Sequence, residues 1–148
     1  MRILLGIDDS PHSKAALEHV CHGSWPPDTR VTVLSAVRVP VYVYAPADFP
    51  AIPAPEQVAA LTKEHEALVC RAQKRLREAG LAGEARVVHG DAREALVETA
   101  RNESTDLVVV GSHGRTGLSK LLLGSVASHV VTHSPCSVLV VKLPGWRG

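Results

Sequence analysis

Short runs rich in Val, Leu and Ile recur five times along the chain, and a longer stretch of different character separates each run from the next. β-Branched residues in short runs are typical of strands, and uninterrupted apolar runs are typical of strands that are buried on both faces. The pattern therefore predicts five buried strands, over Arg2 to Ile7, Arg30 to Val39, Glu84 to His89, Asp106 to Val110 and Ser137 to Lys142.

The stretches between these runs carry helix signals. Ser10 and Pro11 are a typical N-cap and first helical residue, and that helix is expected to end at Gly23. Apolar residues from Glu56 to Ala79 recur with a helical period. Two further helices are predicted, one that follows the N-cap Asp91 and runs to about Glu103, and one over roughly Leu118 to Thr132 with an irregularity at Gly124.

Strands and helices alternate throughout, so the connections are expected to be right-handed crossovers between parallel strands. We expect a single α/β domain over residues 1–148, with an open, Rossmann-like sheet of five parallel strands and helices on both faces. Residues 40–55 carry five prolines and are expected to form a long loop after the second strand. That loop is either a solvated connection or a lid at the ligand end of the sheet.

Charge and composition exclude several classes of protein. The 16 basic and 15 acidic side chains give a net charge of +1, which indicates neither a nucleic acid nor a membrane as partner. No apolar run approaches the roughly 18 residues of a membrane span, and no signal-peptide pattern begins the chain, so we expect a cytoplasmic protein. The three widely spaced cysteines suit reduced, buried thiols, and no group of residues has the spacing of a metal site.

The residues that leave the first and fourth strands point to a ligand site. In an open α/β sheet, ligands bind beyond the carboxyl ends of the strands where the strand order reverses, and these two strands are expected to be neighbours there. Asp8 and Asp9 follow the first strand, and the glycine-rich segment 111–117 follows the fourth. Glycine permits positive φ and close approach of the backbone, so successive N–H groups can converge on an anion.

Further residues near this edge of the sheet suit a phosphate. His113 and Arg115 lie in the glycine-rich segment. Gly124 and Ser125 supply a second anion site if a regular helix begins there, through free amides, the helix dipole and the serine hydroxyl. Asp8 is expected to accept hydrogen bonds from a ribose or base, or to bind Mg²⁺ between itself and the phosphates. Together these groups look like a nucleotide site.

The glycines have a defined spacing: Gly111, two residues, Gly114, nine residues, Gly124 and then Ser125. This spacing matches neither the G-x-x-x-x-G-K-[ST] loop nor the G-x-G-x-x-G loop. It resembles instead the G-2x-G-9x-G-[ST] signature of ATP-binding universal stress proteins. The resemblance extends over nearly the whole chain, through the segments 3–11, 106–117, 124–127 and 135–141.

The resemblance implies a fold of the adenine nucleotide alpha hydrolase-like type, with strands in the order 3-2-1-4-5. It also implies bound ATP, or ADP or AMP in its place, with Mg²⁺. Asp8 would meet the ribose or base. The other implied contacts are Gly6, Ile7 and Ala36 with adenine, Val110, Gly111, His113, Gly114 and Arg115 with the ribose and first phosphates, and Gly124, Ser125 and Val126 with the outer phosphates.

The resemblance further implies a homodimer that forms through the last strand, residues 137–142. In this chain the strand is apolar and is expected at an edge of the sheet. An uncovered edge of this kind would be open to pairing with other chains, and a second copy would cover it.

Three functional classes stay open. The first, which the resemblance favours, is a stress-response or signalling module that acts through nucleotide occupancy. The second is a slow ATP hydrolase or phosphotransferase, for which Asp8, Asp9 and Arg115 are candidates but no general base is recognisable. The third is a phospho-acceptor domain of the receiver type, with Asp91 the aspartate nearest the required position.

Four histidines are expected at the surface or partly packed: His12, His65, His129 and His133.

Overall fold

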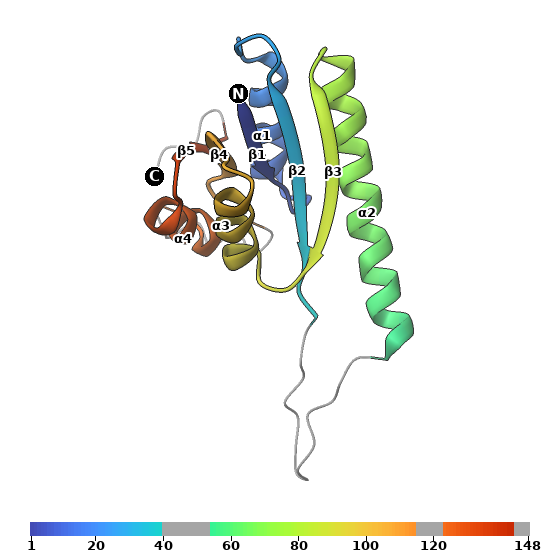
Figure 1. The fold of residues 1–148 in the computed structure, drawn as a ribbon. Coiled ribbons are helices and arrows are strands. Elements are labelled where there is room, and N and C mark those ends of the chain that lie inside the picture. The colour runs from blue at the N-terminus through green and yellow to red at the C-terminus, as the bar shows by residue number, and fades with distance from the viewer. Residues whose placement is uncertain (40–53, 115–122, 144–148) are drawn as a thin grey trace.

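A computed structural model of the chain describes residues 1–39, 54–114 and 123–143, along which strands and helices alternate (Figure 1). The strands are β1 (Arg2–Gly6), β2 (Arg30–Val37), β3 (Ala82–His89), β4 (Leu107–Gly111) and β5 (Ser137–Val141). The helices are α1 (Pro11–His22), α2 (Pro55–Glu78), α3 (Ala92–Asn102) and α4 (Ser125–His133). Most of the predicted loop 40–55, Arg115 and the predicted helix start at Leu118 lie outside the described residues.

The strands form one parallel sheet in the order β3-β2-β1-β4-β5, as the family resemblance implied. β1 lies in its centre and pairs on both sides, so that Ile3 is beside Val31 of β2 and Leu107 of β4. The chain first builds the sheet outward from β1 to β3 and then returns to add β4 and β5 on the other side. The strand order therefore reverses between β1 and β4, where open α/β sheets bind their ligands.

This order decides against one of the three functional classes. A receiver domain has the flavodoxin-like order 2-1-3-4-5, which differs from the order of this sheet. Asp91 instead caps α3, because its side chain accepts a hydrogen bond from the backbone N–H of Arg93. It also pairs with the Arg93 guanidinium at 2.7 Å. The phospho-acceptor alternative is therefore wrong.

Helices α1 and α2 cover one face of the sheet, and α3 and α4 cover the other (Figure 1). Successive side chains of a strand point to opposite faces, so each strand packs against both helix layers. Ile3 and Leu5 pack with α1 and α2 in one buried cluster. Leu4 packs with α3 and α4 in the other. A central strand that meets helices on both faces must be apolar at every position, which explains the uninterrupted apolar run after Arg2.

Capping residues define where the helices begin. Ser10 caps α1, since its Oγ accepts a hydrogen bond from the Ser13 N–H at 3.1 Å, and Pro11 follows at the first position as predicted. α4 begins at Ser125 with Gly124 as its N-cap, so Gly124 starts this helix rather than interrupting it. The condition under which Gly124 and Ser125 can supply an anion site is met.

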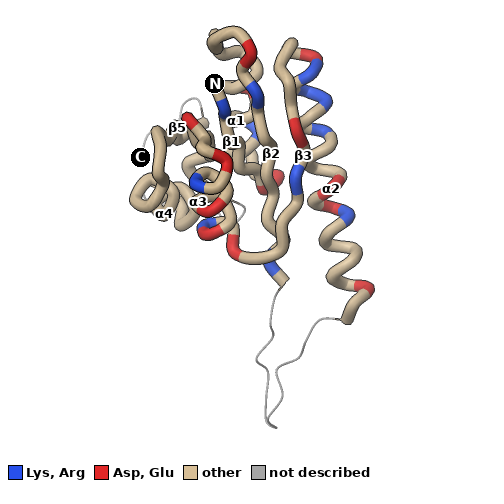
Figure 2. The backbone as a smooth tube through the Cα atoms, in the orientation of Figure 1, with Lys and Arg blue, Asp and Glu red and all other residues tan. Residues whose placement is uncertain are grey.

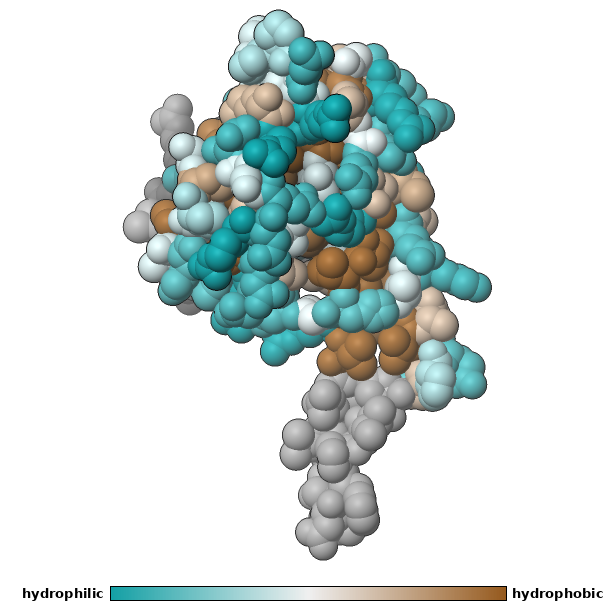
Figure 3. Space-filling model, in the orientation of Figure 1, coloured by the Kyte–Doolittle hydropathy of each residue, from teal (hydrophilic) through white to brown (hydrophobic). Residues whose placement is uncertain are grey.

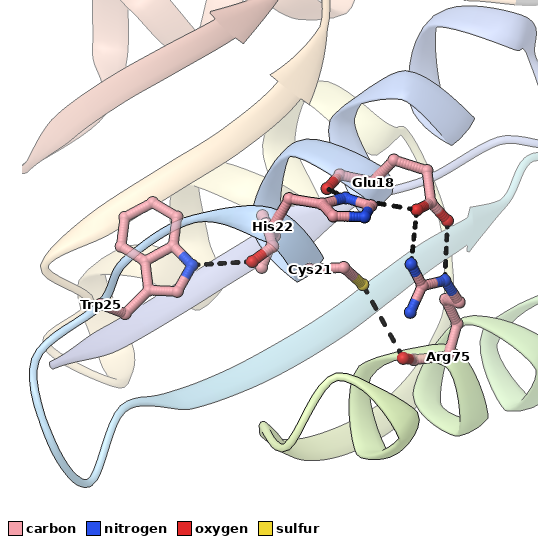
Figure 4. A network of polar contacts seen from close by, with 6 residues as sticks. Glu18, Cys21, His22, Trp25 and Arg75 are labelled. Carbon is pink, nitrogen blue, oxygen red and sulfur yellow. Dashed lines mark hydrogen bonds and ion pairs between the residues drawn. The ribbon is translucent and has the colours of Figure 1, made fainter.

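A polar network joins α1 to α2 (Figure 4). Arg75 on α2 donates two hydrogen bonds to the Glu18 carboxylate on α1, at 2.9 and 2.7 Å. The Cys21 thiol donates to the carbonyl oxygen of Arg75 at 3.8 Å, and burial raises the pKa of that thiol. A bidentate pair of arginine and carboxylate is directional, so it sets the position of one helix on the other.

Two expectations about burial are wrong. His65, expected at the surface or partly packed, is buried within α2, with 7% of its surface exposed. Cys70, expected to be a buried thiol, is exposed, whereas Cys21 and Cys136 are half-buried. The cysteines are free, as expected.

The surface carries both signs of charge, interspersed over α2 and β3 (Figure 2). On the edge strand β3, Arg86 pairs with Glu84 and with Glu103, the residue that follows α3. Charged side chains on an edge strand oppose pairing with other chains. Hydrophobic residues gather where the carboxyl ends of β2 and β3 lie beside α2 (Figure 3). Within the described ranges, no helix is long and apolar enough to cross a membrane.

We expect Leu76→Ala to lower the free energy of unfolding by about 2–5 kcal/mol, because it removes buried methyl groups and leaves a cavity. Leu76 packs α2 on the sheet and is 0% exposed. Urea titration followed by circular dichroism measures the loss. Val131→Ala on α4 is the control, because Val131 is 50% exposed and its loss should change stability by only about 0.5 kcal/mol. Equal effects of the two substitutions would contradict the packing of α2.

Candidate functional site

A cavity of about 290 Å³ lies at the carboxyl ends of β1 and β4, where the strand order reverses. Its walls come from the ends of β1, β2 and β4 and from the first turns of α1, α3 and α4. Its volume is at the lower end of the roughly 300–1,000 Å³ that small-molecule pockets have. The sheet and three helices thus converge on one place that is large enough for a small ligand.

Eleven of the twelve site residues predicted from the sequence line this cavity. They come from segments far apart in the chain: Gly6, Ile7, Asp8, Ala36, Val110, Gly111, His113, Gly114, Gly124, Ser125 and Val126. The twelfth, Arg115, lies outside the described residues. The fold therefore brings the described residues of the prediction together, whatever ligand they bind.

Five further lining residues were missed: Ser13, Leu34, Ala92, Leu96 and Ala127. The signals for most of them were present in the sequence. Leu34 lies two residues before Ala36 and so on the same face of β2. Ala92 follows the predicted cap Asp91, and Leu96 lies one helical turn later on the same face.

The first turn of α1 lies directly on the backbone of Gly111 and leaves no room for a side chain there. A Cβ at this position would stand 2.6 Å from the carbonyl carbon of His12 and 2.8 Å from its oxygen. Neither atom can move without shifting the helix backbone. No glycine of the signature has a positive φ. These glycines were expected to allow a positive φ or a close approach of the backbone. The structure shows the close approach and not the positive φ.

Gly114 leaves room for the Asp8 carboxylate, since a Cβ on Gly114 would stand 2.7 Å from Asp8 Oδ2. The other carboxylate oxygen, Oδ1, accepts a hydrogen bond from the backbone N–H of Ser10 at 3.1 Å. The N–H of Asp8 itself donates to Ser13 Oγ at 3.4 Å. These contacts hold the carboxylate at the cavity wall, between the end of β1 and the glycine-rich segment.

Asp9 is directed elsewhere, although the sequence paired it with Asp8. Its φ of 65° lies in the left-handed region, which aspartate tolerates better than most residues. Its side chain pairs with Lys14 at 2.9 Å and does not line the cavity. Asp8, the aspartate predicted to contact the ligand, lines the cavity, and Asp9 does not.

The three helices that reach the cavity differ in how they begin. Ser10 caps α1 and Asp91 caps α3, and hydrogen bonds from Arg93 hold the pKa of Asp91 at about 2. Gly124 gives α4 no side-chain cap. The first amides of α4 therefore border the cavity without an intrahelical acceptor, and the positive end of the helix dipole adds to them. This helix start is suited to an anion such as a phosphate.

Two histidines pack beside the cavity. His113 lines it and is buried, with its Nδ1 3.2 Å from Ser112 Oγ. The His12 ring is next to it, with the two centroids 5.2 Å apart. Within the described part of the chain, His12 Nε2 is buried and has no hydrogen-bond partner. Burial and then the neighbouring His113 lower the pKa of His12, against the opposing effect of Asp8.

The cavity combines three kinds of group. Leu34, Leu96 and Val110 supply an apolar wall that suits a flat ring. Asp8 accepts hydrogen bonds from hydroxyl or amino groups. The start of α4 attracts negative charge. A molecule with an aromatic base, a sugar and a phosphate would use all three.

The sequence matches the model of the universal stress protein family over residues 1–142, a range that includes every lining residue of the cavity. The chain belongs to the universal stress protein family. The sheet order and the two helix layers are those of the adenine nucleotide alpha hydrolase-like fold of this family.

Known universal stress proteins resemble the chain over most of its length. MJ0531 of Methanocaldococcus jannaschii is 34% identical over 145 residues, which are 97% of this chain and 82% of that protein. The solved structure of MJ0577, from the same organism, has a TM-score of 0.80 and 27% identity, over 98% of this chain and 97% of that one. A universal stress protein solved in complex with cAMP has a TM-score of 0.68 and 26% identity, over 95% of this chain and 96% of that one.

The lowered pKa of His12 predicts a pH dependence of stability. An unfolded histidine takes up its proton near 6.5, whereas folded His12 does so only at lower pH. The unfolded state therefore binds more protons as the pH falls below about 6.5, and the folded state is destabilised. We expect His12→Phe to reduce this loss in urea titrations at pH values from about 7 to 5. His22→Gln, at an exposed position of α1, is the control, and an unchanged pH profile in His12→Phe would contradict the account.

Proposed function

We propose that the chain is an ATP-binding universal stress protein, a cytoplasmic stress-response or signalling module that acts through nucleotide occupancy. The observation that carries the proposal is the open start of α4, which borders the same cavity as the Asp8 carboxylate. An anion site, a hydrogen-bond acceptor and an apolar wall match the three parts of a nucleotide. ADP and AMP share the adenosine part and are the other candidate ligands.

Each part of the nucleotide has proposed contacts in the cavity. Asp8 accepts hydrogen bonds from the ribose or base. Adenine lies against Gly6, Ile7 and Ala36, which are at the ends of β1 and β2. The ribose and first phosphates follow Val110, Gly111, His113, Gly114 and Arg115, and the outer phosphates are bound by Gly124, Ser125 and Val126.

A solved relative supports the choice of an adenine nucleotide. The universal stress protein that was determined with cAMP covers nearly the whole of this chain at 26% identity. Cyclic AMP contains the adenine, ribose and one phosphate that ATP also contains. The glycine signature of residues 111–125 is the feature of this chain that favours a ligand with further phosphates.

Mg²⁺ is proposed to enter with the nucleotide rather than to occupy a protein site. Among the described residues, no group of three or more His, Cys, Asp or Glu side chains could hold a metal ion. Asp8 is the carboxylate of the described lining. Its alternative to the ribose or base contact is to contribute one oxygen to Mg²⁺, with the phosphates contributing others. Such sharing is usual for Mg²⁺ in nucleotide sites.

Occupancy, rather than turnover, is the proposed basis of action. Phosphoryl transfer needs a positioned water or hydroxyl and a group that orients it. The titratable side chains of the described lining are Asp8 and His113, and the proposal assigns both to the bound nucleotide. We therefore expect phosphate release, if measured, not to scale with protein concentration.

A homodimer through β5 is proposed as well. β5 is an edge strand, and its outer side pairs with no other strand of the described sheet. Leu139 and Val141 are only partly buried, although both pack against one of the two core clusters. A second copy of the chain would cover this apolar edge.

We expect Gly114→Val and Gly124→Val each to weaken ATP binding by about tenfold or more, which corresponds to a loss of about 1.4 kcal/mol of binding free energy. A Cβ on Gly114 would displace Asp8 Oδ2, and a Cβ on Gly124 would stand 3.2 Å from His113 Cα at the anion site. Isothermal titration with ATP and Mg²⁺ measures the affinity of each variant.

Ala82→Val is the control, because it also introduces a valine, here at an exposed position of β3 away from the cavity. It should bind ATP as the wild type does. If both glycine variants fold and keep wild-type affinity, the proposed position of the nucleotide is wrong.

Sedimentation equilibrium tests the proposed dimer. The chain mass is 15.8 kDa, and we expect a species of twice that mass at micromolar concentration. Val138→Lys should shift the population towards monomer, whereas Thr132→Lys, at an exposed position of α4, should not. A monomer at all concentrations would rule out the dimer.

A further inference from the structure

We propose that Ser35 and His65, two buried residues outside the cavity, form a positioning pair that sets the place of the Asp8 carboxylate within it. The inference rests on the proposed nucleotide site and names residues that control its affinity without touching the ligand. Neither residue lines the cavity. Neither belongs to the glycine signature.

The pair lies on the opposite face of β2 from the cavity. Leu34 and Ala36 line the cavity, so Ser35, between them on the strand, points to the face covered by α2. There it meets His65 of α2, and the Ser35 Oγ to His65 Nδ1 distance is 2.8 Å. Ser35 is 1% exposed and His65 is 7% exposed. Both polar groups are therefore removed from water.

Proton counting fixes the direction of each hydrogen bond. Ser35 Oγ also lies 2.8 Å from the carbonyl oxygen of Ile7 and donates to it. A carbonyl oxygen can only accept, and a hydroxyl has one hydrogen. His65 must therefore carry a hydrogen on Nδ1 and donate it to Ser35 Oγ. A protonated His65 would keep that hydrogen, so the chain of two bonds holds in either charge state.

The chain of bonds ends on the peptide group that carries Asp8. The Ile7 carbonyl and the Asp8 N–H belong to the same planar unit. Ser35 holds its oxygen at 2.8 Å, while Ser13 Oγ accepts from its N–H at the longer distance of 3.4 Å. The Ser35 contact is the shorter of the two. The orientation of this plane sets where the Asp8 side chain leaves the backbone.

Packing alone does not require a polar pair at this position. Val31 and Val33 occupy the preceding positions of β2 on the same face and are fully buried. A third valine would continue the pattern without the cost of removing a hydroxyl and an imidazole from water. Unlike a valine, the polar pair makes a hydrogen bond to Ile7, whose peptide group leads to Asp8 at the cavity wall. We assign the pair a positioning role because of this bond.

Matched substitutions at His65 test the role. His65→Phe keeps a ring of similar size and removes the donor, whereas His65→Asn keeps an N–H donor at the place of Nδ1. We expect His65→Phe and Ser35→Ala to weaken ATP binding about three- to tenfold, the loss typical of one hydrogen bond. His65→Asn should bind within about twofold of the wild type, since it restores the donor. Isothermal titration at matched folded fractions, checked by urea titration, measures these affinities.

A double-mutant cycle tests whether the pair acts through Asp8. In the Asp8→Asn background, Ser35→Ala should cause no further loss of affinity, because the group that it positions is already altered. A structural weakening of the whole domain would lower affinity equally in both backgrounds. Equal losses, or wild-type affinity in both Ser35→Ala and His65→Phe, would overturn the proposal.

Amide NMR spectra of the ligand-free protein keep this test separate from the proposed function. His65→Phe should move the signals of Asp8 and Ser13, whereas His65→Asn should leave both near their wild-type positions. If the wild type binds no ATP, the nucleotide proposal fails, and these spectra still test the positioning. Unmoved Asp8 and Ser13 signals in His65→Phe would overturn it.

Discussion

The contact between the first turn of α1 and the backbone of Gly111 is the constraint on which the site depends. A side chain at Gly111 would meet the carbonyl carbon of His12 at 2.6 Å, so the helix can lie here only because position 111 is glycine. The same contact brings Ser10 Oγ within 3.4 Å of the His113 carbonyl oxygen, to which it donates. The ends of β1 and β4 are thereby held together, with Asp8 on one and the glycine-rich segment on the other.

The start of α4, where we propose that an anion binds, is tied to the sheet by one further residue. Ser112 donates its backbone N–H to Val141 at the end of β5, at 2.8 Å, and accepts from the N–H of Gly124 at 2.7 Å. These two hydrogen bonds set where α4 starts and therefore where its open amides lie. The backbone of Ser112 and His113, directly after β4, thus contacts both the start of α1 and the start of α4. These two helix starts border the cavity, and the side chains around it supply its polar and apolar groups.

The sequence predicted what depends on local pattern. Apolar runs located the strands, and Ser10 and Asp91 marked helix starts. The glycine spacing, with the family resemblance that it carries, identified eleven of the residues that line the cavity. Long-range contacts were not visible. The burial of His65 depends on its meeting Ser35, which is 30 residues away, and no local signal shows that pairing. The sequence placed Asp8 and not Asp9 in the predicted site, but the left-handed φ of Asp9 and its pairing with Lys14, which direct it away from the cavity, could not be foreseen.

The most direct test of the account is an amide NMR titration of the wild-type protein with ATP and Mg²⁺. The account predicts that the largest shifts occur at the start of α4, in Ser125 to Ala127, and at Asp8 and Gly111 to Gly114. Residues of α2 and β3 far from the cavity should stay unchanged. Saturating ATP that moves no signal, or that moves signals of α2 and β3 instead, would contradict the account.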